Sequence, residues 1–148
     1  MIREKQIVID AINQKAPLIT GTADKIWEYA ELSLQEYKSA ALYCETLEKE
    51  GFQVQKGIAG IETAFCASFG SGRPVIGILA EYDALSGLSQ KSGSLKQEEI
   101  VAGGNGHGCG HNLLGAGAMA AAIGVKAFLE ETKCPGTVIL YGCPGEEG

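Results

Sequence analysis

The chain of 148 residues is short of basic side chains and of long apolar segments, and both shortages exclude classes of protein. Lysine and arginine total 12 against 18 aspartate and glutamate, which gives a net charge of -6. The basic residues are scattered and form no stripe that could neutralise phosphates, so we expect no nucleic-acid partner. The longest apolar run, 113–125, stops at Lys126 and is too short to cross a bilayer, so we expect no membrane partner.

The sequence also lacks the marks of export. Residues 1–5 carry charges of both signs before a short apolar stretch, which is unlike the start of a secretory signal peptide. The five cysteines are an odd number at irregular spacings, which argues against a disulfide framework. We therefore expect reduced thiols, a cytoplasmic location and, from the length, one domain with a buried core.

Hydrophobic periodicity predicts helices at two places. Apolar residues recur at roughly helical spacing over 24–50, which predicts an amphipathic helix or helix pair that ends at Gly51. A second helix is expected over 111–131, where glycines and alanines would let its backbone lie close to a sheet. The polar segment 86–104 predicts a long exposed loop before it.

Short apolar runs predict strands over 52–58, 63–69, 75–82 and 137–142. The segment Gly70-Ser71-Gly72 predicts a hairpin-like turn between the second and the third of these strands. The third run is apolar on both faces, as is typical of a strand inside a covered sheet. This order of elements indicates an α/β layered domain.

Three pairs of polar side chains lie where open α/β sheets place their sites, beyond the carboxyl ends of strands. The pairs are Glu81 with Asp83, Cys109 with His111, and Glu146 with Glu147. If the strands that precede them run parallel, all three pairs meet at one edge of the sheet.

The hexapeptide 106–111, Gly-His-Gly-Cys-Gly-His, holds both histidines of the chain beside one cysteine. Imidazole and thiolate are the usual ligands of zinc and neighbouring transition metals. Only one residue separates Cys109 from His111, unlike the ligand pairs of structural zinc fingers, so a catalytic or dinuclear site is favoured. One alternative is a glycine-rich loop whose histidines cap the next helix, and another is a Cys109 nucleophile activated by a histidine.

The acidic pairs have two interpretations each. Glu146 and Glu147 follow an apolar strand on a turn, where one could bind a metal and the other take a proton from metal-bound water. An adjacent glutamate pair is otherwise commonly a solvated surface feature. Asp83 could orient a ligand or bridge two metals, or it could simply cap the turn into the following loop.

Three segments, 79–85, 106–115 and 141–148, together resemble the metal-dependent amidohydrolases related to aminoacylase and hippurate hydrolase, and the resemblance runs over the whole chain. It implies an α/β fold, a three-layer α/β/α zinc-exopeptidase-like catalytic domain that holds two divalent metals, Mn²⁺ or Zn²⁺. Within it Cys109, His111 and Glu147 match metal-ligand positions and Glu146 matches the general base.

The resemblance also indicates where this sequence departs from its relatives. Asp83 matches an aspartate that supports a metal ligand in related peptidases, where a histidine stands two residues earlier, in the place of Glu81. His107 has no ligand role in the resemblance and is expected to support the ligands from outside.

The same resemblance implies hydrolysis of the amide bond of an N-acyl amino acid, with p-aminobenzoyl-glutamate as the leading substrate. Residues 1–148 are expected to form the amino-terminal portion of the catalytic domain, without the inserted lid or dimerisation domain and the carboxyl-terminal portion. Two further histidine ligands would lie in that missing part, so these residues alone are expected to be inactive. A homologous A subunit or a second copy of the full-length protein is the expected partner.

Two other classes of function stay open at the level of sequence. The glycine-rich loop before a helix favours a nucleotide-binding module, although no Gly-x-Gly-x-x-Gly is completed over 103–117 and no Lys-Ser/Thr follows Gly115. A noncatalytic metal-binding or subunit-interaction domain is the second alternative.

Overall fold

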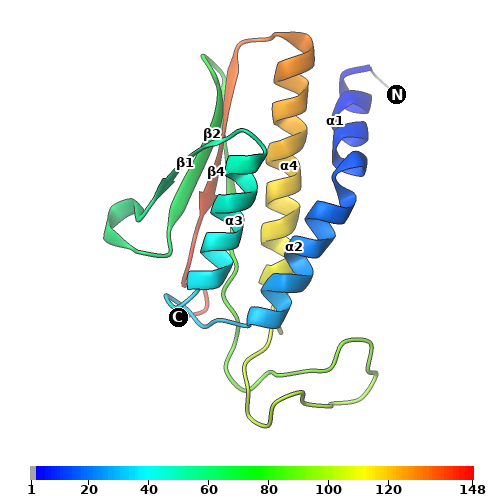
Figure 1. Cartoon of the computed structure of the whole chain (residues 1–148), viewed down its shortest axis with the longest axis vertical. Coiled ribbons are helices and arrows are strands. Elements are labelled where there is room, and N and C mark those ends of the chain that lie inside the picture. Colours follow the sequence, from blue (N-terminus) through cyan, green and yellow to red (C-terminus); the bar gives the residue numbers. More distant parts are fainter. Residues whose placement is uncertain (1–2) are drawn as a thin grey trace.

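In the computed structural model, which describes residues 3–148, helices lie on one face of a four-stranded sheet (Figure 1). The elements in chain order are α1 (Arg3–Gln14), α2 (Ala16–Tyr29), α3 (Tyr37–Lys49), β1 (Gln53–Lys56), the short 3-10 turn η1 (Ile58–Gly60), β2 (Phe65–Ser71), β3 (Val75–Ala80), α4 (His111–Thr132) and β4 (Gly136–Gly142). The predicted helix pair, the four strands and the later helix are confirmed, whereas α1 was not expected.

The sheet has the order β1-β2-β4-β3. β4 pairs parallel with β3 and antiparallel with β2, and β1 pairs antiparallel with β2. The expected hairpin between β2 and β3 is therefore wrong, because β4 returns from α4 and lies between them. Gly70 has φ +87, and a side chain there would collide with the backbone of Gly136. The glycine at the end of β2 thus permits the close approach of β4.

The core lies between the sheet and the helices. α3 packs on β1 and β2, α4 packs on β3 and β4, and α1 and α2 pack on α4 from the side away from the sheet (Figure 1). Its largest fully buried apolar and aromatic side chains are Tyr43, Tyr82, Phe65, Ile26, Leu47, Met119, Leu140 and Val138.

α4 has 22 residues and is long and apolar enough to cross a membrane by length and composition, contrary to the expectation from its shorter apolar run. Its contacts with the sheet on one side and with α1 and α2 on the other explain this composition, because it is the central helix of the core.

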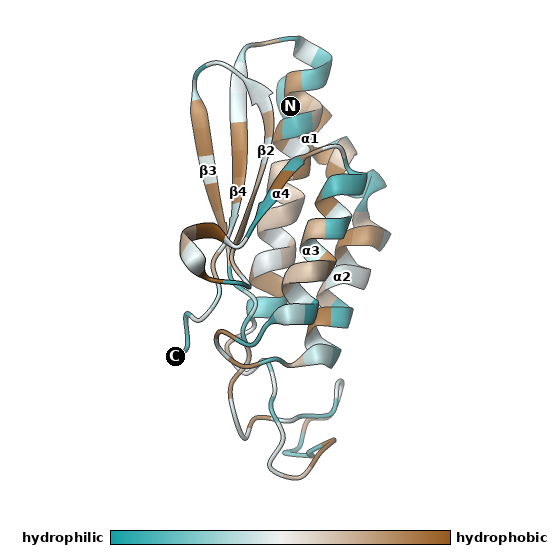
Figure 2. Ribbon diagram, turned by 60° about the vertical axis from the view of Figure 1, so that its left-hand side comes forward, coloured by the Kyte–Doolittle hydropathy of each residue, from teal (hydrophilic) through white to brown (hydrophobic). Residues whose placement is uncertain are grey.

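β3 differs from its prediction. It is the edge strand of the sheet, and Val75 and Leu79 are 56% and 62% exposed. Figure 2 shows β3 as a largely hydrophobic strand whose outer side meets no helix within residues 3–148. The prediction of a strand inside a covered sheet is wrong for this part of the chain, because neither a further strand nor a second helical layer lies within the described residues.

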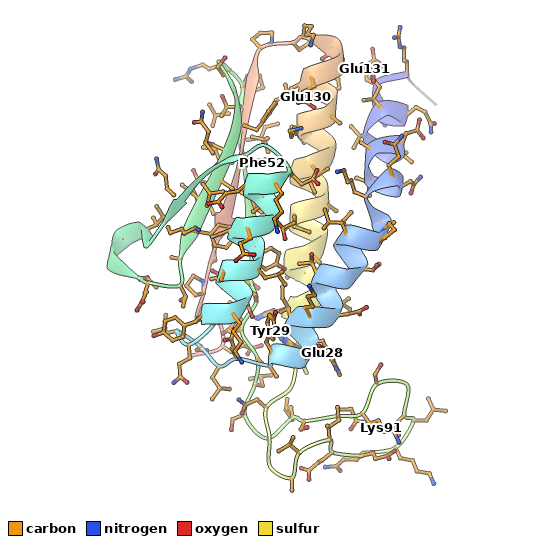
Figure 3. All side chains as sticks on the ribbon, viewed as in Figure 1. Glu28, Tyr29, Phe52, Lys91, Glu130 and Glu131 are labelled. Carbon is orange, nitrogen blue, oxygen red and sulfur yellow. The ribbon has the colours of Figure 1, made fainter. Side chains whose placement is uncertain are left out.

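The segment between β3 and α4 is the exposed loop that the sequence predicts. Its two ends are held together by a bridge between Leu85 and Gly106, and its tip is closed by an ion pair of 2.9 Å between Lys91 and Glu98. Lys91 lies well away from the helices (Figure 3). The loop therefore leaves the body of the molecule and returns to the point where the hexapeptide begins.

Candidate metal centre

The three pairs of polar side chains meet at one edge of the sheet, as the sequence predicts for parallel strands. β3 and β4 are parallel neighbours, so the residues after Ala80 and after Gly142 leave the sheet at the same end. The carboxyl end of the chain lies at that end, on the same side of the molecule as the 86–106 loop (Figure 1). α4 begins there with His111, which brings the hexapeptide to the same place.

Two glycines fix the path of the hexapeptide. A side chain at Gly106 would collide with the carbonyl oxygen of Leu88, so the chain can pass this close to the loop only with glycine there. Gly110 has φ 90 at the residue before α4, a left-handed conformation that glycine adopts without strain. The turn at Gly110 leads directly into His111, so that Cys109 and His111 lie on either side of it.

His111 is the centre of the cluster and is 2% exposed. Its Nδ1 lies 2.8 Å from Asp83 Oδ1, and because a carboxylate only accepts hydrogen bonds, Nδ1 carries the donating proton. Nε2 then has a lone pair and faces three further carboxylates: Glu81 Oε2 at 3.1 Å, Glu146 Oε2 at 3.6 Å and Glu147 Oε1 at 3.8 Å. Lone pairs gathered in this way repel one another unless a cation lies between them.

The donor atoms form two sets that share His111. In one set the ligand atoms of Cys109, His111 and Glu147 all lie within 4.8 Å of one another, and in the other those of Glu81, His111 and Glu146 do. Thiolate, imidazole and carboxylate together suit zinc, and the carboxylate-rich set also suits manganese. The residues predicted as metal ligands are thus brought together, and Glu81 joins them.

Two further observations fit a bound cation. Glu147 Oε1 is buried and has no hydrogen-bond partner within residues 3–148, although it points at the cluster. The exposed thiol of Cys109 has a raised pKa, first because of the adjacent Glu147 carboxylate, then because of desolvation, and further because Glu147, Glu146 and Glu81 are negatively charged. A divalent cation would satisfy the orphaned oxygen and displace the thiol proton.

Asp83 contacts His111 at Nδ1, whereas the three glutamates face Nε2, and Asp83 is 1% exposed. Burial alone would raise the pKa of Asp83, but hydrogen bonds from the Glu147 amide, the Ser33 hydroxyl and His111 outweigh burial, and the pKa is lowered. Asp83 Oδ2 accepts from Ser33 Oγ and from the Glu147 N–H, both at 2.8 Å. Its geometry is that of an orienting carboxylate behind a ligand. Ser33 was not singled out from the sequence, because it lies 50 residues away from Asp83.

His107 does not reach the cluster. Its ring is buried, lies 6.4 Å from the ring of Trp27, and has Nε2 3.0 Å from the carbonyl oxygen of Ile26. Burial lowers the pKa of His107 and outweighs the opposing contact with Ile26. His107 therefore packs the hexapeptide onto α2, and it makes no hydrogen bond to a candidate ligand, contrary to the expectation that it supports the ligands.

Comparison with known proteins identifies relatives of this chain. No protein-family model matches it. It is 50% identical over 143 residues to the B subunit of p-aminobenzoyl-glutamate hydrolase of Escherichia coli (strain K12), covering 97% of this chain and 30% of that protein. A dinuclear metal-binding peptidase of the M20 family from Bacillus subtilis matches with a TM-score of 0.67 at 27% identity, over 88% of this chain and 35% of that one. The chain belongs to the family of M20 metal-dependent peptidases and amidohydrolases.

One further sequence relative and one further solved structure are similar to this chain. Xaa-Arg dipeptidase of Mus musculus is 30% identical over 156 residues, which cover 97% of this chain and 32% of that protein. The aminobenzoyl-glutamate utilization protein from Klebsiella pneumoniae has the same fold, with a TM-score of 0.60 at 17% identity over 95% of this chain and 39% of that one. The chain spans about a third of the length of these two curated relatives. The predicted family and α/β fold class are confirmed.

Proposed function

We propose that the full-length protein containing this chain hydrolyses the amide bond of an N-acyl amino acid at a centre of two divalent cations. The observation that carries the proposal is that three carboxylates surround His111 Nε2. The Cys109 thiol belongs to the same cluster, because its sulfur lies within 4.8 Å of the ligand atoms of His111 and Glu147. Dinuclear metal binding by the M20 relative from Bacillus subtilis supports it.

In this proposal the side chains of the centre have distinct roles. Cys109, His111 and Glu147 would hold a cation, and Asp83 keeps the His111 ring turned so that Nε2 faces the carboxylates of the centre. When bound, the cations lower the pKa of a water molecule and stabilise negative charge on the substrate carbonyl oxygen. Glu146, whose side chain is 52% exposed, takes the proton of the attacking water and returns it to the leaving nitrogen.

The finer features of the proposal follow the relative of highest identity given above. We take p-aminobenzoyl-glutamate as the leading substrate, because the Escherichia coli relative is named as the B subunit of a hydrolase of this compound. A homologous A subunit or a second copy is the proposed partner, Mn²⁺ or Zn²⁺ the proposed metal, and the cytoplasm the proposed location. Residues 1–148 supply only part of the donor set in this proposal and are inactive alone.

Changing Glu146 to Gln in the full-length protein tests the role of the base. The amide keeps the shape of the side chain and cannot take a proton, so we expect kcat to fall by about 10²–10⁴-fold while the metal content stays unchanged. Glu62, an exposed glutamate remote from the centre in sequence, offers Glu62→Gln as the matched control. Measurement of kcat beside metal content decides, and a fully loaded E146Q protein with turnover within about threefold of wild type rejects the assignment.

Removal of the metal tests the centre itself. Dialysis against a chelator should abolish amide hydrolysis, and addition of Zn²⁺ or Mn²⁺ should restore it, with the more effective ion identifying the metal. Chelator-sensitive hydrolysis by residues 1–148 alone would contradict the proposal that they are inactive without the rest of the protein.

A further inference from the structure

Glu36 is a carboxylate that the candidate centre does not use, yet its side chain is fully buried, with 0% exposure. It lies at the residue before α3, where a side chain often caps the helix, but it makes no such contact. Glu31 caps α3 in its place, accepting hydrogen bonds from the N–H groups of Lys38 and Ser39 at 2.9 Å each. Burial of an ionisable group without hydrogen bonds is costly, so the partners of Glu36 indicate its role.

Both oxygens of Glu36 accept hydrogen bonds from segments far apart in the chain. Oε1 accepts from the N–H of Gly145 at 2.8 Å and from the N–H of Leu34 at 2.9 Å, and Oε2 accepts from Thr63 Oγ at 3.0 Å. The contact with Gly145 joins residues 109 positions apart. One oxygen thus ties the segment before α3 to the turn after β4.

That turn carries the acidic pair of the centre and is fixed at two points. Glu36 holds the N–H of Gly145, and Asp83 Oδ2 holds the N–H of Glu147 at 2.8 Å. Glu146 lies between these two anchors, and its side chain is half exposed. A turn held only at Glu147 could pivot and move the Glu146 carboxylate, whereas a turn held at both ends cannot.

The local backbone leaves little freedom for another arrangement. Gly145 has φ +74, and a side chain there would meet Leu34 at 2.9 Å, so the turn packs directly against the segment that Glu36 organises. Ser33, next to Leu34, donates to Asp83. Both anchors of the turn therefore connect to the 33–36 segment.

We infer that Glu36 is a positioning residue that sets the place of Glu146 and Glu147 by accepting the hydrogen bond of Gly145. The inference rests on the proposed function, in which Glu146 is the base and Glu147 a ligand. It assigns to Glu36 an effect on the geometry of the acidic pair, in addition to any effect on stability. Misplacement of a catalytic group by about 1 Å can cost on the order of 100-fold in rate.

Two substitutions of Glu36 distinguish the effect of side-chain length from the effect of charge. Glu36→Gln keeps the length: its amide oxygen can accept from both N–H groups, and its NH₂ group can donate to Thr63 Oγ. Glu36→Asp keeps the charge but withdraws the carboxylate by one methylene, beyond hydrogen-bond distance of Gly145. If position matters, Gln preserves function and Asp impairs it, which is the reverse of what a requirement for charge would give.

The test measures kcat, KM, metal affinity and thermal stability of both variants in the full-length protein. We expect kcat within about threefold of wild type for E36Q and lowered by about 10–100-fold for E36D, with KM changed by less than about threefold in each. We expect the affinity for added Zn²⁺ to weaken in E36D and not in E36Q, because Glu147 shares the turn. Glu31→Ala is the matched control, since it removes a cap from the same segment and should lower stability without lowering kcat.

Three results overturn the inference: E36D with wild-type kcat and Zn²⁺ affinity, E36Q impaired as strongly as E36D, or Glu31→Ala with the same loss of kcat as E36D. If the wild-type protein hydrolyses no amide, the proposed function fails, and the Zn²⁺ affinities of E36Q and E36D still test the placement of the turn. If E36D does not fold, an E36Q protein with the kcat and Zn²⁺ affinity of wild type supports the inference.

Discussion

Asp83 uses its two carboxylate oxygens for different partners, and this makes it the most informative single residue of the centre. Oδ1 accepts from His111 Nδ1, and Oδ2 accepts from Ser33 Oγ and the Glu147 N–H. The first contact turns the lone pair of Nε2 toward the cluster, and the second places Glu147. A carboxylate can serve both sides because it presents only acceptors.

Replacement of Asp83 by Asn should weaken metal binding. An asparagine must point its NH₂ group at one side: toward the Glu147 N–H, which leaves two donors facing each other, or toward His111, which moves the ring proton to Nε2 and removes the lone pair that binds a cation. We expect the affinity of the full-length protein for Zn²⁺ to fall by about 10–100-fold, measured by calorimetric titration with a competing chelator.

Ser33→Ala provides the comparison for this substitution. It removes one donor to Asp83 and leaves both the charge and the contact with His111, so the loss of affinity should stay below about fivefold. Equal affinities of the Asp83→Asn protein and the wild type would show that Asp83 does not orient the ligand.

At the scale of elements, the close packing of α4 against the end of β3 sets the position of His111, which is the first residue of α4. Gly115 stands one turn into α4, and a side chain there would collide with the Tyr43 hydroxyl and with the carbonyl oxygen of Glu81. Gly117, on the opposite side of the helix, has no atom within 4 Å of the position where its side chain would begin. These two of the three glycines of α4 thus differ in their surroundings: a side chain would be blocked at Gly115 and would have space at Gly117.

Alanine at these two positions should change stability in opposite directions. Gly115→Ala should lower the free energy of unfolding by about 1–3 kcal/mol, because the helix must move away from β3 or the neighbours must shift. Gly117→Ala should raise it by about 0.5–1 kcal/mol, because alanine favours the helix and meets nothing. Urea denaturation of both variants measures this, and a loss of stability in Gly117→Ala would contradict the packing described for α4.

The elements themselves could largely be predicted, whereas their pairing could not. The helical spacing of apolar residues is a local property, and it found α3 and α4 within a few residues of their ends, whereas α2 begins at Ala16, eight residues before the predicted start at residue 24. The insertion of β4 between β2 and β3 depends on contacts between distant segments, which no local turn signal at 70–72 reveals. α1 was not predicted, because charged and polar residues interrupt the apolar side chains of the helix that packs on α4.

The residues of the candidate site could likewise be predicted from the sequence only in part. Cys109, His111, Glu146 and Glu147 stand out in the sequence because their residue types and close spacing are typical of metal chemistry, and the structure brings them together. Glu36 and Ser33 act through hydrogen bonds to groups 109 and 50 residues away, so their place beside the centre follows only from the fold.

For the molecule as a whole, the outer side of the β3 and β4 pair is a regular sheet surface on which residues 3–148 leave apolar side chains uncovered. Val75, Leu79 and Tyr141 are 56%, 62% and 38% exposed there. Leu79 pairs in register with Tyr141, whose ring lies against Gly77 on the same side of the sheet. β3 also presents a free edge, whose backbone groups can pair with another strand.

Expressed as these 148 residues, the chain should therefore self-associate through this surface. Replacement of Leu79 by Lys places a charge on the exposed side of the edge strand, which opposes both apolar contact and strand pairing, and we expect it to weaken self-association by at least about tenfold. Leu95→Lys is the matched control, because Leu95 is 104% exposed in the 86–106 loop and the same charge there leaves the sheet untouched. Sedimentation velocity over a range of concentrations compares the two proteins, and equal self-association of both would assign the contact to a surface other than the outer side of β3.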